Sequence, residues 1–241
     1  MTRSQTSVLR FWRRWIVLSG LLAVVLALTA CGSGGSSAPS PTSNSETSQA
    51  PTSTLLTADE HIEEGDALFE RGLLGAAIRE YDQVILLDPQ HLDAYIKRGI
   101  SRRMRGQLDE AISNFSQVIR LDPQLPRGYF ERGSTYGSMG RISLAIKDFD
   151  EAIRLDPEYA EAYNTRGFAL IGQGRQEDAL EDFNEAIRLN PNFDNAYVNR
   201  AFAYTALGDD AAAQEDIDKA IELGISAEAL REEIDSLKEI R

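Results

Sequence analysis

The sequence predicts an all-α solenoid of five helix pairs followed by a C-terminal capping helix. Three observations predict this fold class. Residues recur at an interval of 34 over most of the chain, the apolar residues within each interval have helical spacing, and the pattern changes at both ends. A unit of this length cannot bury its own apolar face, so we expect the units to stack on one another.

Several classes of residue keep the 34-residue interval. The prolines of this set are Pro89, Pro123, Pro157 and Pro191. The glycines are Gly72, Gly106, Gly140, Gly174 and Gly208. The alanines are Ala77, Ala111, Ala145, Ala179 and Ala213. The aromatic residues form two columns, Tyr95, Tyr129, Tyr163 and Tyr197, and Tyr81, Phe115, Phe149 and Phe183.

Each unit is predicted to be two helices joined by a glycine turn. In the fourth unit, the apolar residues of 162–170 and 179–189 have helical spacing, and Gly174 lies between the two segments. Glycine accepts the left-handed conformation that ends a helix, whereas Pro191 cannot continue the second helix. The unit is therefore expected to be a helical hairpin bounded by proline.

The small and the aromatic columns predict how the helices pack. Gly167 and Ala179 lack large side chains, so we expect them where the two helices of a unit come closest. We expect the columns of Phe183 and Tyr163 to fill the space between neighbouring units.

A 34-residue unit with these residues resembles the tetratricopeptide repeat, and the match extends over about residues 58–225. The resemblance implies a right-handed solenoid in which the first helix of each unit lines a concave groove. It also implies that the groove takes a peptide segment or a helix of a protein partner. No cofactor, metal or small-molecule substrate follows from it, and no catalytic residue is assigned.

The resemblance assigns the groove residue by residue. The positions that it places in the groove are Ile62, Asp66, Ile96, Lys97, Ile100, Arg103, Arg127, Phe130, Ser134, Asn164, Phe168, Asn199, Phe202 and Thr205. Apolar anchors beside a few polar groups suit an amphipathic helix or an extended peptide. The three cations predict a basic patch for a carboxylate, and the asparagines are candidates for holding a peptide backbone. For each aromatic residue the alternative is core packing.

The two ends of the repeat array differ from its interior. Thr57 and Glu60 have the spacing of a capping box, which begins a helix. Residues 226–241 are expected to form a last helix that covers the array. Its apolar stripe consists of Ala227, Leu230, Ile234 and Leu237.

Residues 1–30 have the pattern of a secretory signal. Arginines precede an apolar run of 16 residues, from Trp15 to Ala30, which is shorter than the roughly 20 residues that a spanning helix needs. The segment from Leu28 to Cys31 resembles the lipobox of bacterial lipoproteins. This resemblance implies cleavage before Cys31 and attachment of lipid, palmitate among the acyl chains, to that cysteine.

Residues 31–55 are predicted to tether the folded domain, residues 56–225 and 226–241, to a membrane. Segment 32–54 is dominated by Ser, Thr, Pro, Gly, Asn and Ala, a composition that has almost nothing to bury. The expected location is extracytoplasmic, on the periplasmic face in a diderm cell. Gly32 rather than an aspartate follows the cysteine, which favours the outer membrane.

Charge and composition exclude some functions. The net charge is −13, and because residues 1–30 hold four arginines and no acid, the rest carries 21 basic and 38 acidic residues, a net of −17. Such a domain repels phosphate backbones, so we expect no nucleic-acid partner. The only histidines, His61 and His91, lie in different units and give no metal-ligand pair.

The recurring charged residues predict scaffold rather than catalysis. Arginine recurs at Arg98, Arg132, Arg166 and Arg200, and aspartate at Asp148, Asp182 and Asp216. They are expected to form ion pairs between the two helices of a unit.

Two alternatives to a membrane-anchored adaptor remain, a scaffold on the cytoplasmic face held by an uncleaved N-terminal anchor, and an enzyme.

Overall fold

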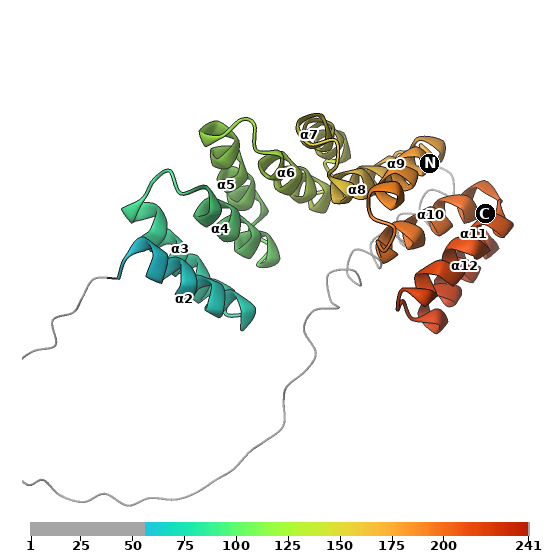
Figure 1. Cartoon of the computed structure of the whole chain (residues 1–241), viewed down its shortest axis with the longest axis horizontal. Helices are drawn as coiled ribbons and strands as arrows, with labels where there is room; N and C mark the ends of the chain where they lie inside the picture. Colours follow the sequence, from blue (N-terminus) through green and yellow to red (C-terminus); the bar gives the residue numbers. More distant parts are fainter. Residues whose placement is uncertain (1–55, 241) are drawn as a thin grey trace, which may run out of the picture. The chain divides into compact units, whose positions relative to one another are not determined.

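The computed structural model describes residues 56–240, which form α-helices and contain no strand (Figure 1). The predicted signal, the tether and Cys31 lie outside these residues. The first helices of the five units are α2 (Ala58–Glu70), α4 (Leu92–Met104), α6 (Pro126–Ser138), α8 (Ala160–Ile171) and α10 (Asp194–Leu207). The second helices are α3 (Leu74–Leu87), α5 (Leu108–Leu121), α7 (Ile142–Leu155), α9 (Gln176–Leu189) and α11 (Asp210–Glu222). The chain then forms α12 (Ala227–Ile240).

The helices pack as five successive hairpins, which confirms the expected fold class. Each first helix makes its most extensive contacts with the second helix that follows it, and each second helix then packs on the first helix of the next unit. The helices α4, α6, α8 and α10 also contact one another in sequence, whereas the second helices barely do within residues 56–240. The array therefore curves toward its first helices, whose surface we call the inner face.

A glycine and an aromatic ring set the distance between the two helices of a unit. A Cβ atom added at Gly167 would lie 2.7 Å from Cε1 of Phe183 and 3.1 Å from the carbonyl oxygen of Ala179. This confirms the predicted close approach. Phe183 is fully buried and also clusters with Ala203 of the next unit, so the ring fills space within its own unit as well as between units.

The turn residues end the helices as expected. Gly174 has a φ of +76°, the left-handed conformation that L side chains rarely adopt. At the other end of the unit, the hydroxyl of Tyr197 donates a hydrogen bond to the carbonyl oxygen of Pro191 at 3.2 Å. Two further tyrosines of this column, Tyr95 and Tyr129, bond the prolines before them in the same way.

Both ends of the array are capped. The side chain of Thr57 accepts from the backbone N–H of Glu60, whose carboxylate accepts from Thr57 in return, so the predicted capping box is present. At the other end, α12 packs on α10 and α11. The side chains of Leu230 and Ile234 are buried, and their burial accounts for the apolar stripe of this helix.

Two glycines of α6 give a matched test of the packing. A Cβ at Gly137 would meet no atom within 4 Å, so Gly137→Ala has no steric cost. Because alanine lowers the backbone entropy of the unfolded chain, the substitution should stabilise the domain by about 0.5–1 kcal/mol. A Cβ at Gly133 would lie 2.9 Å from the ring of Phe149, so Gly133→Ala should destabilise it by about 1–3 kcal/mol. Urea unfolding followed by circular dichroism measures both, and equal effects would contradict the packing described.

Candidate functional site

The structure places all fourteen predicted groove residues on the first helices. They are Ile62 and Asp66 on α2; Ile96, Lys97, Ile100 and Arg103 on α4; Arg127, Phe130 and Ser134 on α6; Asn164 and Phe168 on α8; and Asn199, Phe202 and Thr205 on α10. Successive first helices from α4 to α10 contact one another, so these residues come from neighbouring helices of the inner face.

Burial divides these residues into two groups. Ile96, Asn164, Asn199 and Thr205 are buried, at 0 to 8% exposure, and can present little area to a partner. The other ten are half-buried or exposed. Among them, Ile100, Ser134, Phe168 and Phe202 occupy the same position of four successive units, 34 residues apart, and form an accessible row.

Near the N-terminal end of the array, Lys97 joins the first two units by binding aspartates. Its Nζ lies 2.6 Å from Oδ2 of Asp66 on α2 and 2.9 Å from Oδ2 of Asp93 on its own helix. The hydroxyl of Tyr81 also donates to Asp66, at 2.9 Å. Burial opposes the charge of Lys97, but the hydrogen bonds to the two aspartates outweigh it and raise the pKa of the ammonium.

The two predicted arginines are also paired within the chain. Nη2 of Arg103 lies 2.9 Å from Oε2 of Glu131, and Nε of Arg127 lies 3.9 Å from Oε1 of the same glutamate. Lys97, Arg103 and Arg127 thus each face a carboxylate of this chain, which reduces the charge of the predicted basic patch, but Arg103 and Arg127 share the single carboxylate of Glu131. Glu131 lies 34 residues after Lys97 and so occupies the same position of the next unit. A comparison of that position across the units would have identified a carboxylate among the predicted cations.

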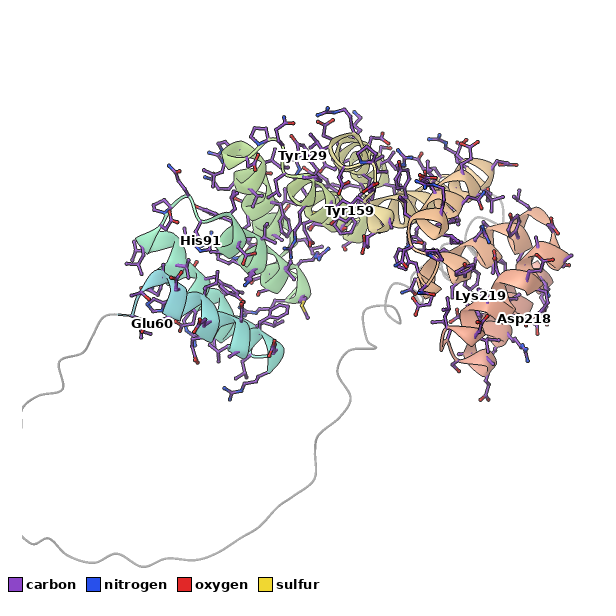
Figure 2. The ribbon with its side chains drawn as sticks, in the orientation of Figure 1. Glu60, His91, Tyr129, Tyr159, Asp218 and Lys219 are labelled. Atoms are coloured by element: carbon purple, nitrogen blue, oxygen red, sulfur yellow. The ribbon has the colours of Figure 1, made fainter. Side chains whose placement is uncertain are left out.

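Aromatic rings meet in the middle of the inner face. The ring centroid of Phe130 lies 4.9 Å from that of Tyr159 and 5.9 Å from that of Phe149. Burial raises the pKa of Tyr159, and Glu131 adds to this effect. Figure 2 labels Tyr159 at the junction of α6 and α8. Phe130 therefore packs in the core as well as lining the face, and the tyrosine was missed because it precedes its helix.

The two predicted asparagines bind each other. Nδ2 of Asn199 donates to Oδ1 of Asn164 at 2.9 Å, and both side chains are buried. The bond joins α8 to α10. These amides stabilise the joint between two units, so they fix the spacing of the half-buried Phe168 and Phe202 beside them.

Between the packed helices, the recurring arginines bridge three helices. Arg166 on α8 donates from Nε and Nη2 to both carboxylate oxygens of Asp182, at 2.9 and 2.6 Å, and from Nη1 to Asp150 of the preceding unit at 2.7 Å. Its guanidinium lies over the ring of Tyr163, with Cζ 5.7 Å from the centroid. Burial raises the pKa of Asp182, while Arg166 pulls it down.

The same bridge recurs in the neighbouring units, which confirms the predicted ion pairs. Arg132 binds both oxygens of Asp148, and Arg200 binds both oxygens of Asp216. In the second unit Asn114 takes the place of the aspartate, and Arg98 binds it together with Asp82 of the first unit.

The histidines have structural partners. Nδ1 of His61 lies 2.8 Å from Oε2 of Glu80, and Nδ1 of His91 accepts from the backbone N–H of Ala94 at the start of α4. Figure 2 labels His91 at this position. No group of three or more His, Cys, Asp or Glu within residues 56–240 could hold a metal ion. In the same range, no helix has the length and apolarity required to span a bilayer.

A small polar cleft lies between α7, α8 and α9. It has a volume of about 230 Å³ and an apolar floor of Ile146 and Leu170. Its walls are charged and consist of Asp150, Arg166, Arg175, Asp178, Glu181 and Asp182. Arg166 binds Asp150 and Asp182 of the wall, so one bridge that joins two units forms part of the cleft, while Arg175 pairs with Asp178 within its own unit.

This geometry defines a helical-repeat protein with an inner face of first helices. Models of the tetratricopeptide repeat match residues 101–140, 136–174, 169–208 and 194–223, which together span just over half of the chain. The chain therefore belongs to the tetratricopeptide-repeat family. The unmatched helices α2 and α3 repeat the same hairpin.

Solved structures of similar fold include MamA, at 28% identity and a TM-score of 0.58 over 66% of this chain and 93% of that protein. TTC0263 of Thermus thermophilus, a thermophilic tetratricopeptide protein, is 20% identical with a TM-score of 0.63, over 75% of this chain and 98% of its own. YrrB, described as having an unusual peptide-binding site, is 22% identical with a TM-score of 0.56, over 73% and 90%. No curated protein matches the sequence.

The arginine bridge predicts a large stability difference between two arginines of the fourth unit. Arg166→Leu leaves the buried Asp182 without its bidentate partner and should destabilise the domain by about 2–4 kcal/mol. Arg188→Leu removes a solvent-exposed pair with Glu185, which water and salt screen, and should leave the stability nearly unchanged. Urea unfolding measures both, and an equal loss would refute the structural role of Arg166.

Proposed function

We propose that this protein is a membrane-anchored, non-enzymatic scaffold of the cell envelope that binds a peptide segment or helix of a partner protein on its inner face. The observation that carries the proposal is the row of Ile100, Ser134, Phe168 and Phe202. These side chains recur on successive first helices, remain partly accessible, and rest on helices that are fixed to one another.

Polar contacts hold the first helices beneath this row together, which suits binding without rearrangement. Lys97 links α2 to α4, Arg103 links α4 to α6, and Asn199 links α8 to α10. A surface that is already ordered loses little conformational entropy when a partner binds. Asp66, Asp93 and Glu131 also offset much of the positive charge of this face, so the partner segment is expected to dock mainly through apolar side chains.

The family supports a protein or peptide as the partner, because repeats of this kind serve as scaffolds for protein–protein contact. YrrB, which shares the fold, is described as a peptide-binding protein. The chemistry of the described residues supports a non-catalytic role as well. The buried aspartates Asp148, Asp182 and Asp216 recur at one position of successive units and are bound by arginines, whereas a catalytic group is needed once.

Membrane anchoring is proposed from the sequence of residues 1–31. The basic start, the short apolar run and the segment ending at Cys31 support lipidation of the cysteine after cleavage. Acyl chains contribute about 0.8 kcal/mol for each buried methylene, so more than one chain would hold the domain firmly. An extracytoplasmic location, on the outer membrane of a diderm cell, follows from this proposal.

Cross-linking in the native cell tests the binding surface. A photo-reactive residue replacing Phe168 on the inner face should yield one dominant product, and the same residue replacing the exposed Glu181 on α9 should not. Mass spectrometry of the product identifies the partner. Absence of a product at Phe168, or identical products from both positions, would mean that the inner face is not the binding surface.

A single substitution tests the anchor. Cys31→Ser removes the thiol that lipid attachment requires and should release the protein from the membrane fraction, with a change in electrophoretic mobility. Ala30→Gly, which keeps the cysteine and a small residue before it, is the control and should remain membrane-bound. Unchanged mobility and unchanged membrane association of Cys31→Ser would support the alternative, an uncleaved N-terminal anchor.

A further inference from the structure

The last helix, α12, docks differently from the first helices that precede it. Relative to the unit before it, each of α4, α6, α8 and α10 packs mainly on the second helix, whereas α12 contacts α10 more extensively than α11 (Figure 1). Thr205 of α10 is fully buried. Its position in the three preceding units is partly accessible and is occupied by Arg103, Gly137 and Ile171. α12 therefore covers part of the inner face that α10 presents.

The polar contact that joins each unit to the one before it is replaced at α12. In the fifth unit, Arg200 of α10 donates from Nη1 to the side chain of Asn184 on the preceding second helix, and the earlier units have the same contact. One interval further along the chain, Ile234 stands at the position of the arginine and Asp218 at that of its acceptor. Asp218 lies 3.9 Å from Arg231 instead, and because both side chains are more than half exposed, this pair contributes little.

Apolar side chains hold α12 in place. Leu230 and Ile234 are buried, at 4% and 0% exposure, and Leu237 is half-buried. Because these residues are four and three positions apart, they lie on one face of the helix. The surface of α10 and α11 is thus shaped to receive the aliphatic face of an amphipathic helix.

The charge of α12 does not match that of the helix beside it. α11 has five acidic residues and one basic residue, a net charge of −4, of which Arg200 offsets one through Asp216. α12 has five acidic residues and two basic residues, a net charge of −3. Because like charges on adjacent helices repel, α12 fits its place by apolar contact but not by charge. A helix with the same apolar spacing and basic flanks would fit by both.

We propose that the surface of α10 and α11 beneath α12 is a second partner site, which takes a basic amphipathic helix of a partner protein in exchange for α12. The aliphatic residues of the partner would occupy the places of Leu230, Ile234 and Leu237, and a lysine or arginine would meet Asp218. α12 is then an internal competitor that keeps the site closed until the partner binds. This site goes beyond the row of side chains on the inner face, and each can exist without the other.

The same charges decide against two other occupants. A second copy of this chain would supply an α12 of the same acidic composition, so exchange between copies improves nothing. A membrane surface carries anionic lipids, which the acidic residues of α11 repel. Charge complementarity therefore selects a basic protein segment.

A peptide made from α12 itself tests the site. The probe has the sequence of residues 227–240 with its five acidic residues replaced by lysine and its apolar residues kept. Fluorescence anisotropy with the full-length protein should show that the probe binds about tenfold more tightly than the unaltered 227–240 peptide. Hydrogen exchange should show that the amides of α12 lose protection when the probe binds. The substitutions in the probe are Glu228→Lys, Glu232→Lys, Glu233→Lys, Asp235→Lys and Glu239→Lys.

A control peptide separates docking from general attraction between opposite charges. It keeps the lysines of the probe and replaces the three aliphatic residues, so it should neither bind nor release α12. The proposal is overturned if the probe does not bind, if the control binds equally well, or if α12 keeps its protection when the probe is bound. The additional substitutions in the control are Leu230→Ser, Ile234→Ser and Leu237→Ser.

A variant with α12 released gives a second measurement. Leu230→Ser with Ile234→Ser in the full-length protein removes the apolar hold of α12, and circular dichroism checks that the repeats remain folded. Since α12 then no longer competes, the basic probe should bind about tenfold more tightly than it does to the unaltered protein. An unchanged affinity would overturn the proposal. The Phe168 cross-link reports separately on the inner-face row, so failure of one site does not imply failure of the other.

Discussion

The close approach of two helices at a glycine and an aromatic ring is the contact on which the rest of this structure depends. At Gly167 the ring of Phe183 occupies the space where a Cβ atom would be, and the same contact recurs at Gly65, Gly99 and Gly133. The hairpin is therefore thin enough to stack at a fixed spacing. That spacing places each arginine bridge between three helices and each inner-face residue beside its counterpart in the next unit.

Two sets of polar contacts then hold the units at that spacing. Between the first and second helices the bridge is nearly invariant, an arginine over a tyrosine that binds the second helices of two units. On the inner face each joint is different, a lysine with aspartates at one joint and a pair of asparagines at another. The recurring arginine bridges give the scaffold its regularity, while the contacts between first helices give each part of the inner face its own chemistry.

The periodic part of the structure could be predicted from the sequence, because the residues that make each contact recur in every unit. The turn at Gly174, the close approach at Gly167, the capping box at Thr57 and the pairing of Arg166 with Asp182 all follow from residues at fixed spacing. Residues could be assigned to the inner face only from their position within the repeat unit. Whether a side chain there is available depends on its neighbours one unit away, and these are not periodic.

The sequence by itself therefore determined the fold, the number of helix pairs and the scaffold role of the recurring charges, since a local pattern repeated five times leaves one way to bury its apolar faces. The tertiary structure alone decided which inner-face groups remain accessible. Lys97 and Arg103 meet carboxylates 31 and 28 residues away, and Asn164 meets Asn199, because stacking brings them within hydrogen-bonding distance. Such pairs neutralise charge and bury amides, and their partners can be identified only when adjacent units are in place.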